Sequence, residues 1–285
     1  MKTYKLYIGG AFPRTESGRY DEVRTIEGQL LANVCRASRK DFRNAVVAAR
    51  KASSGWEGRS AYNRSQVVYR IAEMLQQKES MFIEEMKSMG YTSPRAEREF
   101  DSTIDYILYY AGWCDKYTQI FGSINPVASS HFNFSMPEPM GVVASIADAN
   151  SALMSAVEAI IPAICGGNTV IALASEKFPL CAISLAEVLA TSDLPGGVVN
   201  ILTGKRSELI PQFASHMDVN ALVIRGADSA NSMEIGAYAS ENVKRTKYYE
   251  SESAGKLSPM RIMDLQEIKT TWHPIENISG AGSGY

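Results

Sequence analysis

The sequence contains little of what several specialised classes of protein need. Its four cysteines are widely spaced among 285 residues, so we expect no metal site. No apolar run reaches the roughly 18 residues that a membrane-spanning helix requires, and the first residues lack the apolar core of a secretion signal. The net charge of -2 provides no basic field to attract nucleic acid or acidic membrane. We therefore expect a soluble protein of the cytoplasm.

The second half of the chain alternates between strand and helix patterns. Short apolar strands are predicted at 141–146, 168–173, 198–202, 221–224 and 246–250. Helical patterns separate them, at 152–164, 179–189, 208–216 and 230–238. Strands joined by crossover helices form parallel sheets that are covered on both faces. The sequence thus predicts an α/β fold with an open, Rossmann-like parallel sheet and helices on both faces.

The first half is mainly helical. Residues 30–35 indicate a strand, and Ser38 is a candidate cap for a helix that begins near Lys40. Further helices are predicted at 64–77, 82–89 and 96–117. Residues 131–136 alternate like a strand, and we expect Pro137 and Pro139 to mark its end.

The most specific signal lies between Glu138 and Gly204. It consists of Glu138-Pro139-Met140-Gly141, Pro162-Ala163, Gly167-Asn168-Thr169-Val170, Ala174-Ser175-Glu176 and Leu194-Pro195-Gly196-Gly197-Val198-Val199-Asn200. That order and spacing resembles the cofactor-binding half of the aldehyde dehydrogenase family. The resemblance covers nearly the whole chain and fails after about Pro259, before the catalytic domain that carries the family's nucleophilic cysteine.

The C-terminal part carries a second resemblance. Residues 265–272 are similar to the last strand of the family, which pairs with the segment matching 124–136 in a small antiparallel oligomerisation arm. The implied organisation is a Rossmann-like cofactor-type domain at 1–120 and 138–262, an arm at 121–137 and 263–276, and a loose tail at 277–285. Residues 191–196 and 242–246 resemble most closely the non-catalytic second unit of class-sixteen aldehyde dehydrogenases.

The resemblance places few catalytic groups in this chain. Aldehyde oxidation needs a thiolate nucleophile and donors for the oxyanion, but the four cysteines lie in mostly apolar patterns that favour buried structural thiols. Asn150 aligns with the oxyanion asparagine as a vestige, in a turn where Asp148 opposes negative charge. The general-base position falls on Tyr249 by direct counting, with Glu250 or Glu252 available after a small shift. No catalytic residue is therefore assigned firmly.

The cofactor positions are also altered. Leu173 stands where the family has the lysine that meets the ribose, although Glu176, which also reaches the ribose, is retained. The pyrophosphate segment reads Gly226-Ala227-Asp228, and Asp228 would repel phosphate. Lys205-Arg206-Ser207 replaces the glycines that let the backbone approach the cofactor. Only Glu176 and Gly226 remain as candidate cofactor-binding residues.

These substitutions predict a non-catalytic aldehyde dehydrogenase-like subunit, a pseudoenzyme with no cofactor. It would act as an architectural or regulatory partner of a complete aldehyde dehydrogenase in a hetero-oligomer, or form a homo-oligomer through the arm. The alternative is an oxidoreductase that binds NAD or NADP and acts on aldehydes with weak activity or through a composite site.

Overall fold

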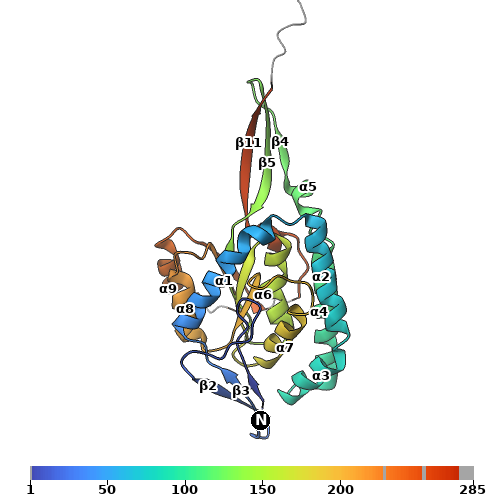
Figure 1. Cartoon of the computed structure of the whole chain (residues 1–285), viewed down its shortest axis with the longest axis vertical. Coiled ribbons are helices and arrows are strands. Elements are labelled where there is room, and N and C mark those ends of the chain that lie inside the picture. Colours follow the sequence, from blue (N-terminus) through green and yellow to red (C-terminus); the bar gives the residue numbers. More distant parts are fainter. Residues whose placement is uncertain (1, 227–228, 252–254, 276–285) are drawn as a thin grey trace, which may run out of the picture.

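A five-stranded parallel sheet has the strand order β10-β9-β6-β7-β8. Figure 1 shows it in the middle of the molecule, among the helices. The computed structural model describes residues 2–226, 229–251 and 255–275. The strands are β6 (Val142–Ile146), β7 (Thr169–Leu173), β8 (Val199–Leu202), β9 (Ala221–Arg225) and β10 (Arg245–Tyr249). Every residue of the inner strands is buried, as expected where both faces of a sheet are covered. The predicted fold class is confirmed.

Successive residues of each strand face two separate apolar layers, because side chains alternate across a sheet. Val143 of β6 packs into the layer of α2, α4, α6 and α7, whereas its neighbour Ala144 packs into that of α1, α8 and α9. The helices are α1 (Arg39–Glu57), α2 (Ala61–Gln76), α3 (Glu79–Ser88), α4 (Ser93–Ala111), α5 (Tyr117–Phe121), α6 (Met154–Cys165), α7 (Leu180–Leu189), α8 (Arg206–Ser215), α9 (Ser229–Ser240) and α10 (Met260–Met263).

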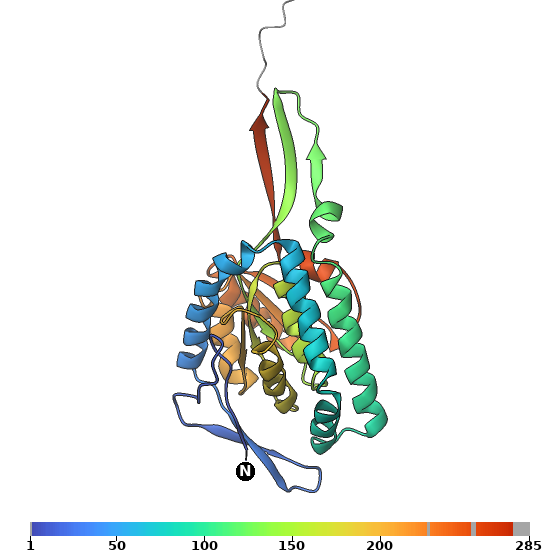
Figure 2. The same cartoon turned by 45° about the vertical axis from the view of Figure 1, so that its right-hand side comes forward.

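Two smaller sheets flank the central one. The first, in the order β1-β3-β2, is formed by β1 (Thr3–Tyr4), β2 (Tyr20–Arg24) and β3 (Leu30–Cys35). The second is antiparallel, in the order β11-β5-β4, and contains β4 (Ser123–Asn125), β5 (His131–Pro139) and β11 (Gln266–Pro274). We call this second sheet the arm. Figure 2 shows that it projects away from the helices and the central sheet.

The root of the arm is tied to the sheet by polar side chains. The buried Gln266 amide donates from Nε2 to the carbonyl oxygen of Gly166 at 3.1 Å, and Asn168 Nδ2 donates to the carbonyl oxygen of Leu265 at 3.0 Å. Arg245 Nη1 donates to the carbonyl oxygen of Gln266 at 2.6 Å. The start of β11 is therefore fixed to the end of α6, to the start of β7 and to β10.

The strand β5 extends further than predicted, because it continues beyond residue 136 through Pro137 and ends at Pro139. Met140 N–H donates to Leu265 O, and Ile275 N–H donates to Ser130 O, so the even-numbered residues of β5 are those that hydrogen-bond to β11. The odd-numbered residues of β5 therefore direct their backbone groups away from β11. On that side β4 pairs only with residues 133–135. Pro137 and Pro139 lie beyond it, so their missing N–H groups leave no ladder bond unmade.

The continuous helix predicted at 96–117 is wrong. The helix α4 ends at Ala111, and its C-cap Gly112 is followed by a turn before α5 begins at Tyr117. The apolar spacing runs on across this break because Trp113 packs against Phe121 and Cys114 is buried, which hides the boundary in the sequence.

Among the described residues, no helix combines the length and the apolar character that spanning a membrane requires.

A buried ion cluster joins α6 to the segment that leads from the sheet to the arm. Glu158 of α6 lies 3.0 Å from Arg261 Nη1 and 4.0 Å from Arg225 Nε, and all three side chains are almost completely buried. The N–H of Gly255 also donates to Glu158, at 2.8 Å. Removing one partner of such a cluster leaves uncompensated charge in a low-dielectric interior.

We therefore expect Glu158→Ala to lower the free energy of unfolding by about 3–5 kcal/mol, as measured by urea denaturation. The matched control is Glu73→Ala, which removes a solvent-exposed carboxylate paired with Arg70 at 3.2 Å and should change stability by less than about 1 kcal/mol. Equal effects of the two substitutions would show that the buried cluster contributes no more than a surface pair.

Candidate functional site

The parallel strands all end at one edge of the central sheet, and the strand order reverses between β6 and β9. From β6 the chain continues to β7 and β8 on one side, then returns to add β9 and β10 on the other. In open α/β sheets, ligands bind in the crevice outside the strand ends at such a switch point. The residues that follow these strands are Asp148, Glu176, Lys205, Gly226 and Glu250.

A cavity of about 530 Å³ lies at this edge, beside the packed pair α8 and α9. Its apolar lining comes from Ile210, Pro211, Ile224, Ile235 and Tyr238. Glu176, Arg206, Ser207 and Gly226 contribute polar groups. The structure thus brings the two candidate cofactor-binding residues, Glu176 and Gly226, to the same cavity.

The carboxylate of Glu176 is already engaged by its own chain. Lys205 Nζ lies 2.9 Å from Oε1, and the backbone N–H of Arg206 donates to Oε2 at 3.1 Å. Arg206 is the first residue of α8, so the carboxylate also meets the positive end of that helix dipole. Partial burial acts to raise the pKa of Glu176, but these partners outweigh it and hold the pKa below 4.5.

The side chain of Arg206 spans the switch point itself. Its guanidinium donates to the carbonyl oxygen of Ala147, just beyond β6, at 2.8 Å, and to that of Arg225, at the end of β9, at 3.2 Å. In the sequence, Lys205-Arg206-Ser207 replaces glycines of the family at this point. The structure shows that the Lys205 and Arg206 side chains form specific bonds, which cross the crevice and tie α8 to three strand ends.

Asp148 occupies the space beside Gly226. The Asp148 side chain is only 3% exposed, and its Oδ1 accepts the N–H of Asn150 at 2.8 Å. A Cβ added to Gly226, whose φ is +62°, would lie 3.0 Å from the carboxylate of Asp148. Glycine is therefore needed here because a carboxylate of this chain approaches its backbone. Ala227 and Asp228 lie outside the described residues, as does Glu252.

Asn150 follows β6 and Glu250 follows β10, and β9 lies between these two strands in the sheet. Asn150 Nδ2 is 3.3 Å from the hydroxyl oxygen of Ser251, the residue after Glu250, and Arg95 donates to the carbonyl oxygen of Asn150 at 2.8 Å. Asn150 and Glu250 are both exposed. Asn150 is thus an exposed turn residue that bonds to Arg95 and Ser251.

The structure places no reactive thiol at this edge. All four cysteines are buried and free, as the sequence predicted. Burial raises the pKa of the Cys165 thiol and that of the Cys181 thiol well above the usual range. A nucleophilic cysteine needs the opposite shift, because the thiolate is the attacking species. Among the described residues, no group of three or more His, Cys, Asp and Glu side chains could hold a metal ion.

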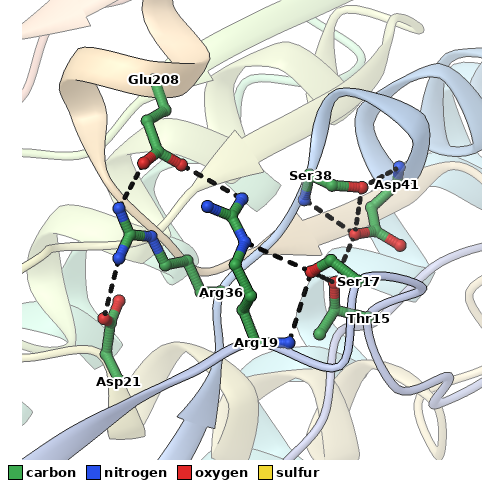
Figure 3. Close-up of polar contacts among 8 residues, drawn as sticks. All are labelled: Thr15, Ser17, Arg19, Asp21, Arg36, Ser38, Asp41 and Glu208. Carbon is green, nitrogen blue, oxygen red and sulfur yellow. Dashed lines mark hydrogen bonds and ion pairs between the residues drawn. The ribbon is translucent and has the colours of Figure 1, made fainter.

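A network that sequence reasoning missed supports the first turn of α8 (Figure 3). Glu208 accepts hydrogen bonds from Arg36 and from Arg19, the latter at 3.2 Å, and Arg36 also lies 3.7 Å from Asp21. The hydrogen bond from Arg36 is the main cause of the lowered pKa of Glu208. These side chains come from β2, β3 and α8 and the loops beside them, so spacing along the sequence gave no signal of the network.

In the same close-up, Thr15 and Ser38 converge on Asp41 of α1. The Ser38 N–H donates to Asp41 Oδ2 at 2.7 Å, and the Asp41 N–H donates to Ser38 Oγ at 3.3 Å. Thr15 Oγ1 also donates to Asp41 Oδ2, at 2.7 Å. The predicted cap at Ser38 is confirmed, and it forms a reciprocal capping box that also holds the N-terminal loop.

Comparison with known proteins agrees with this geometry. Residues 12–266 match the family described as "Aldehyde dehydrogenase family". Retinal dehydrogenase 2 of Gallus gallus is 30% identical over 252 residues, which are 86% of this chain and 48% of that protein. The solved structure of PnpE from Pseudomonas sp. WBC-3 is 27% identical with a TM-score of 0.82, over 87% of this chain and 50% of that one. This chain belongs to the aldehyde dehydrogenase family.

The resemblance is confined to one half of these relatives. An aldehyde dehydrogenase mutant from Bacillus cereus shares the fold with a TM-score of 0.83 at 24% identity, over 87% of this chain and 51% of that chain. The chain therefore spans about half the length of the relatives it matches. That half is an aldehyde dehydrogenase-like, Rossmann-like domain of the NAD(P)-binding type.

The ion pair of Glu176 and Lys205 should make the stability of the fold depend on pH. The pKa of Glu176 is lowered, so its contribution to stability is present above pH 4.5 and is lost as the pH falls through the folded-state pKa. The pKa of Lys205 is raised, chiefly by its hydrogen bond to Glu176, so its contribution is lost as the pH rises through that pKa, above 10.5. We expect Glu176→Gln to cost roughly 0.2–1 kcal/mol at pH 7, because the pair is partly exposed.

Urea denaturation at several pH values checks this. The difference between wild type and Glu176→Gln should shrink toward zero at acidic pH. Glu97→Gln, which alters an exposed carboxylate of α4, should follow the wild type throughout. A difference for Glu176→Gln that does not change between pH 3 and pH 7 would rule out a contribution from the ionised carboxylate.

Proposed function

We propose that this chain acts as a non-catalytic aldehyde dehydrogenase-like subunit, an architectural or regulatory partner of a complete aldehyde dehydrogenase. The observation that carries the proposal is that side chains of the chain itself occupy the edge of the sheet where a dinucleotide would lie. Arg206 bridges the strand ends beside the switch point, and Glu176 is paired with Lys205. The resemblance to the second unit of class-sixteen aldehyde dehydrogenases belongs to the same proposal.

A bound dinucleotide would need three things at this edge. Its pyrophosphate would need free backbone N–H groups and no nearby negative charge, but Asp148 directs a carboxylate toward Gly226. Its ribose would need hydrogen-bonding partners, but Leu173 is fully buried and apolar and Glu176 is already paired. Its bulk would need an open crevice, which Arg206 crosses. Each requirement conflicts with a contact that the chain makes internally.

One observation favours the second candidate function, an oxidoreductase that binds NAD or NADP and acts on aldehydes with weak activity or through a composite site. The cavity beside α8 and α9 remains hollow, at about 530 Å³, and its lining is largely apolar. PnpE, which is similar to this chain, has been solved in complex with nicotinamide adenine dinucleotide. Under this reading, Glu176 and Gly226 would contact the cofactor after Lys205 and Arg206 had moved aside.

The arm supplies a surface for a protein partner. Residues that face each other across antiparallel strands lie on the same face, so the register places Ile124 beside Phe134, with Phe132 and Met136 in line. Ile124, Phe132 and Met136 are exposed, and Phe132 packs against Phe134. We call these four residues the apolar face of the arm. An apolar surface of this kind is typical of a protein interface.

Calorimetric titration separates the two candidate functions. For wild type we expect no saturable binding of NAD or NADP tighter than about 100 μM. The double variant Asp148→Asn with Arg206→Gly should bind NAD at least about tenfold more tightly than wild type, because it removes a carboxylate and a bridging guanidinium from the crevice. Thermal denaturation verifies that the variant folds. Wild-type binding tighter than about 100 μM would instead favour the oxidoreductase.

The partnership is tested with purified components. The chain is mixed with a complete aldehyde dehydrogenase from the same organism, and the mass of the complex is measured by size-exclusion chromatography with light scattering. We expect a complex whose dissociation constant rises at least about tenfold with Phe132→Asp, because burying a charge on the apolar face costs desolvation free energy. Glu138→Gln, on the same strand, is the matched control and should have little effect. The proposed partnership is contradicted if the chain forms a complex with none of the complete aldehyde dehydrogenases of that organism.

A further inference from the structure

Two of the four buried cysteines meet beside the root of the arm. Cys114 lies in the turn between α4 and α5, and Cys165 is the last residue of α6. Both thiols are free, and neither side chain is exposed. Burial is the largest cause of the raised pKa of Cys165, and the Cys114 side chain raises it further, through a hydrogen bond and through its charge. The two thiols are therefore neighbours, although they lie far apart in the sequence.

Hydrogen bonds from α2 hold the backbone on both sides of this pair. Arg64 Nε donates to the carbonyl oxygen of Cys165 at 3.3 Å. Ser65, the next residue of α2, donates from Oγ to the carbonyl oxygen of Ala111 at 2.8 Å. Ala111 ends α4, just before the turn that contains Cys114. The end of α4 and the end of α6 are thus fixed to one point on α2, which keeps the two thiols together.

The same corner anchors both outer strands of the arm. Tyr117, the first residue of α5, donates its hydroxyl to the carbonyl oxygen of Gly166 at 3.5 Å, and α5 leads directly into β4. Gln266, at the start of β11, donates to the same carbonyl oxygen at 3.1 Å. Gly166 directly follows Cys165. A covalent bond at Cys165 would therefore strengthen the point at which the chain enters the arm and the point at which β11 begins.

We propose that Cys114 and Cys165 form a site of reversible oxidation, where hydrogen peroxide converts the two thiols into a disulfide. In the first step one thiolate attacks a peroxide oxygen, so that an S–O bond forms, the O–O bond breaks and water leaves. The second thiol then attacks the sulfenic acid, so that the S–S bond forms, the S–O bond breaks and a second water leaves. The pair loses two electrons and two protons, and one peroxide becomes two waters.

Burial sets the conditions under which this site reacts. The thiolate is the attacking species, so the raised pKa of Cys165 slows the first step in the closed structure. The guanidinium of Arg64 acts in the opposite direction and lowers the pKa of this thiol. Asp115 and Lys116, which follow Cys114 in the turn, are exposed. Local opening of this short surface turn therefore admits peroxide without unfolding the sheet.

The other two cysteines are placed differently and serve as internal controls. Cys35 belongs to the apolar layer of α1, α8 and α9, whereas Cys181 belongs to the layer on the opposite face of the central sheet. A disulfide between them would have to join the two layers that the sheet separates. Cys181 lies beside Glu85, and burial and then the charge of Glu85 raise the pKa of its thiol. The folded chain should therefore select the pair Cys114 and Cys165.

Peptide mapping without reducing agent tests the site in the full chain. After treatment with hydrogen peroxide, we expect one linked pair of peptides, carrying Cys114 and Cys165, and recovery of both thiols with dithiothreitol. The same oxidation of the chain unfolded in urea is the control, and it should give mixed pairs because all four thiols are then accessible. The proposal is overturned if the folded chain forms no disulfide with excess peroxide, pairs Cys35 or Cys181 as readily, or yields only sulfinic and sulfonic acids.

Hydrogen exchange tests the effect on the root of the arm. In the oxidised chain, amide exchange at residues 112–117 should slow at least about tenfold, because the turn can no longer separate from α6. Cys114→Ala should lose this protection, whereas Cys35→Ala, the matched control at another buried cysteine, should keep it. Thermal denaturation verifies that both variants fold. Equal exchange before and after oxidation overturns the clamping of the turn. The inference does not rest on the proposed function, and the nucleotide titration is independent of it.

Discussion

The guanidinium of Arg206 lies across the point where the order of the parallel strands reverses, and it joins the ends of β6 and β9. The carbonyl groups at the ends of β6 and β9 need hydrogen-bond donors, and Arg206 provides them from a helix that starts at the same residue. The first N–H of that helix is satisfied by Glu176, and Glu208 in its first turn is held by Arg19 and Arg36, which flank strands of the small N-terminal sheet. These donors and acceptors are thereby paired within the chain.

The central sheet could be predicted from the sequence because its strands are buried on both faces. A strand of that kind is a short apolar run between turns, such as Val142–Ile146 or Thr169–Leu173, and it needs no partner to be recognised. The helix that starts after Ser38 was predictable for a similar reason, since its cap lies within three residues of its partner. The strand β2 was missed because Tyr20–Arg24 is largely polar and is fixed by its pairing with β3, a tertiary contact. The strand ending of β5 was misplaced because proline is excluded only where a neighbour needs its N–H.

The candidate site was predictable in its residues but not in its bonds. Spacing within the family resemblance identified Glu176 and Gly226 as retained cofactor positions, and Lys205 and Arg206 as altered ones. It could not show that Lys205 is paired with Glu176, or that Asp148 fills the space beside Gly226, because these contacts join residues that are tens of positions apart. The network of Arg19, Arg36 and Glu208 is the extreme case, with partners more than 170 residues apart in sequence. Side chains from separate strand ends meet only after the sheet has formed, so their chemistry is a property of the fold.

The tied root of the arm has a mechanical consequence. A strand of nine residues extends roughly 30 Å, yet its attachment is concentrated at Gln266 and Leu265, which bond to Gly166, Asn168 and Arg245. Because the strand is attached at this end, a small rotation at Gln266 becomes a large displacement at Pro274. Any load applied near Pro274 is transmitted to Gly166 at the end of α6 and to Asn168, which directly precedes β7.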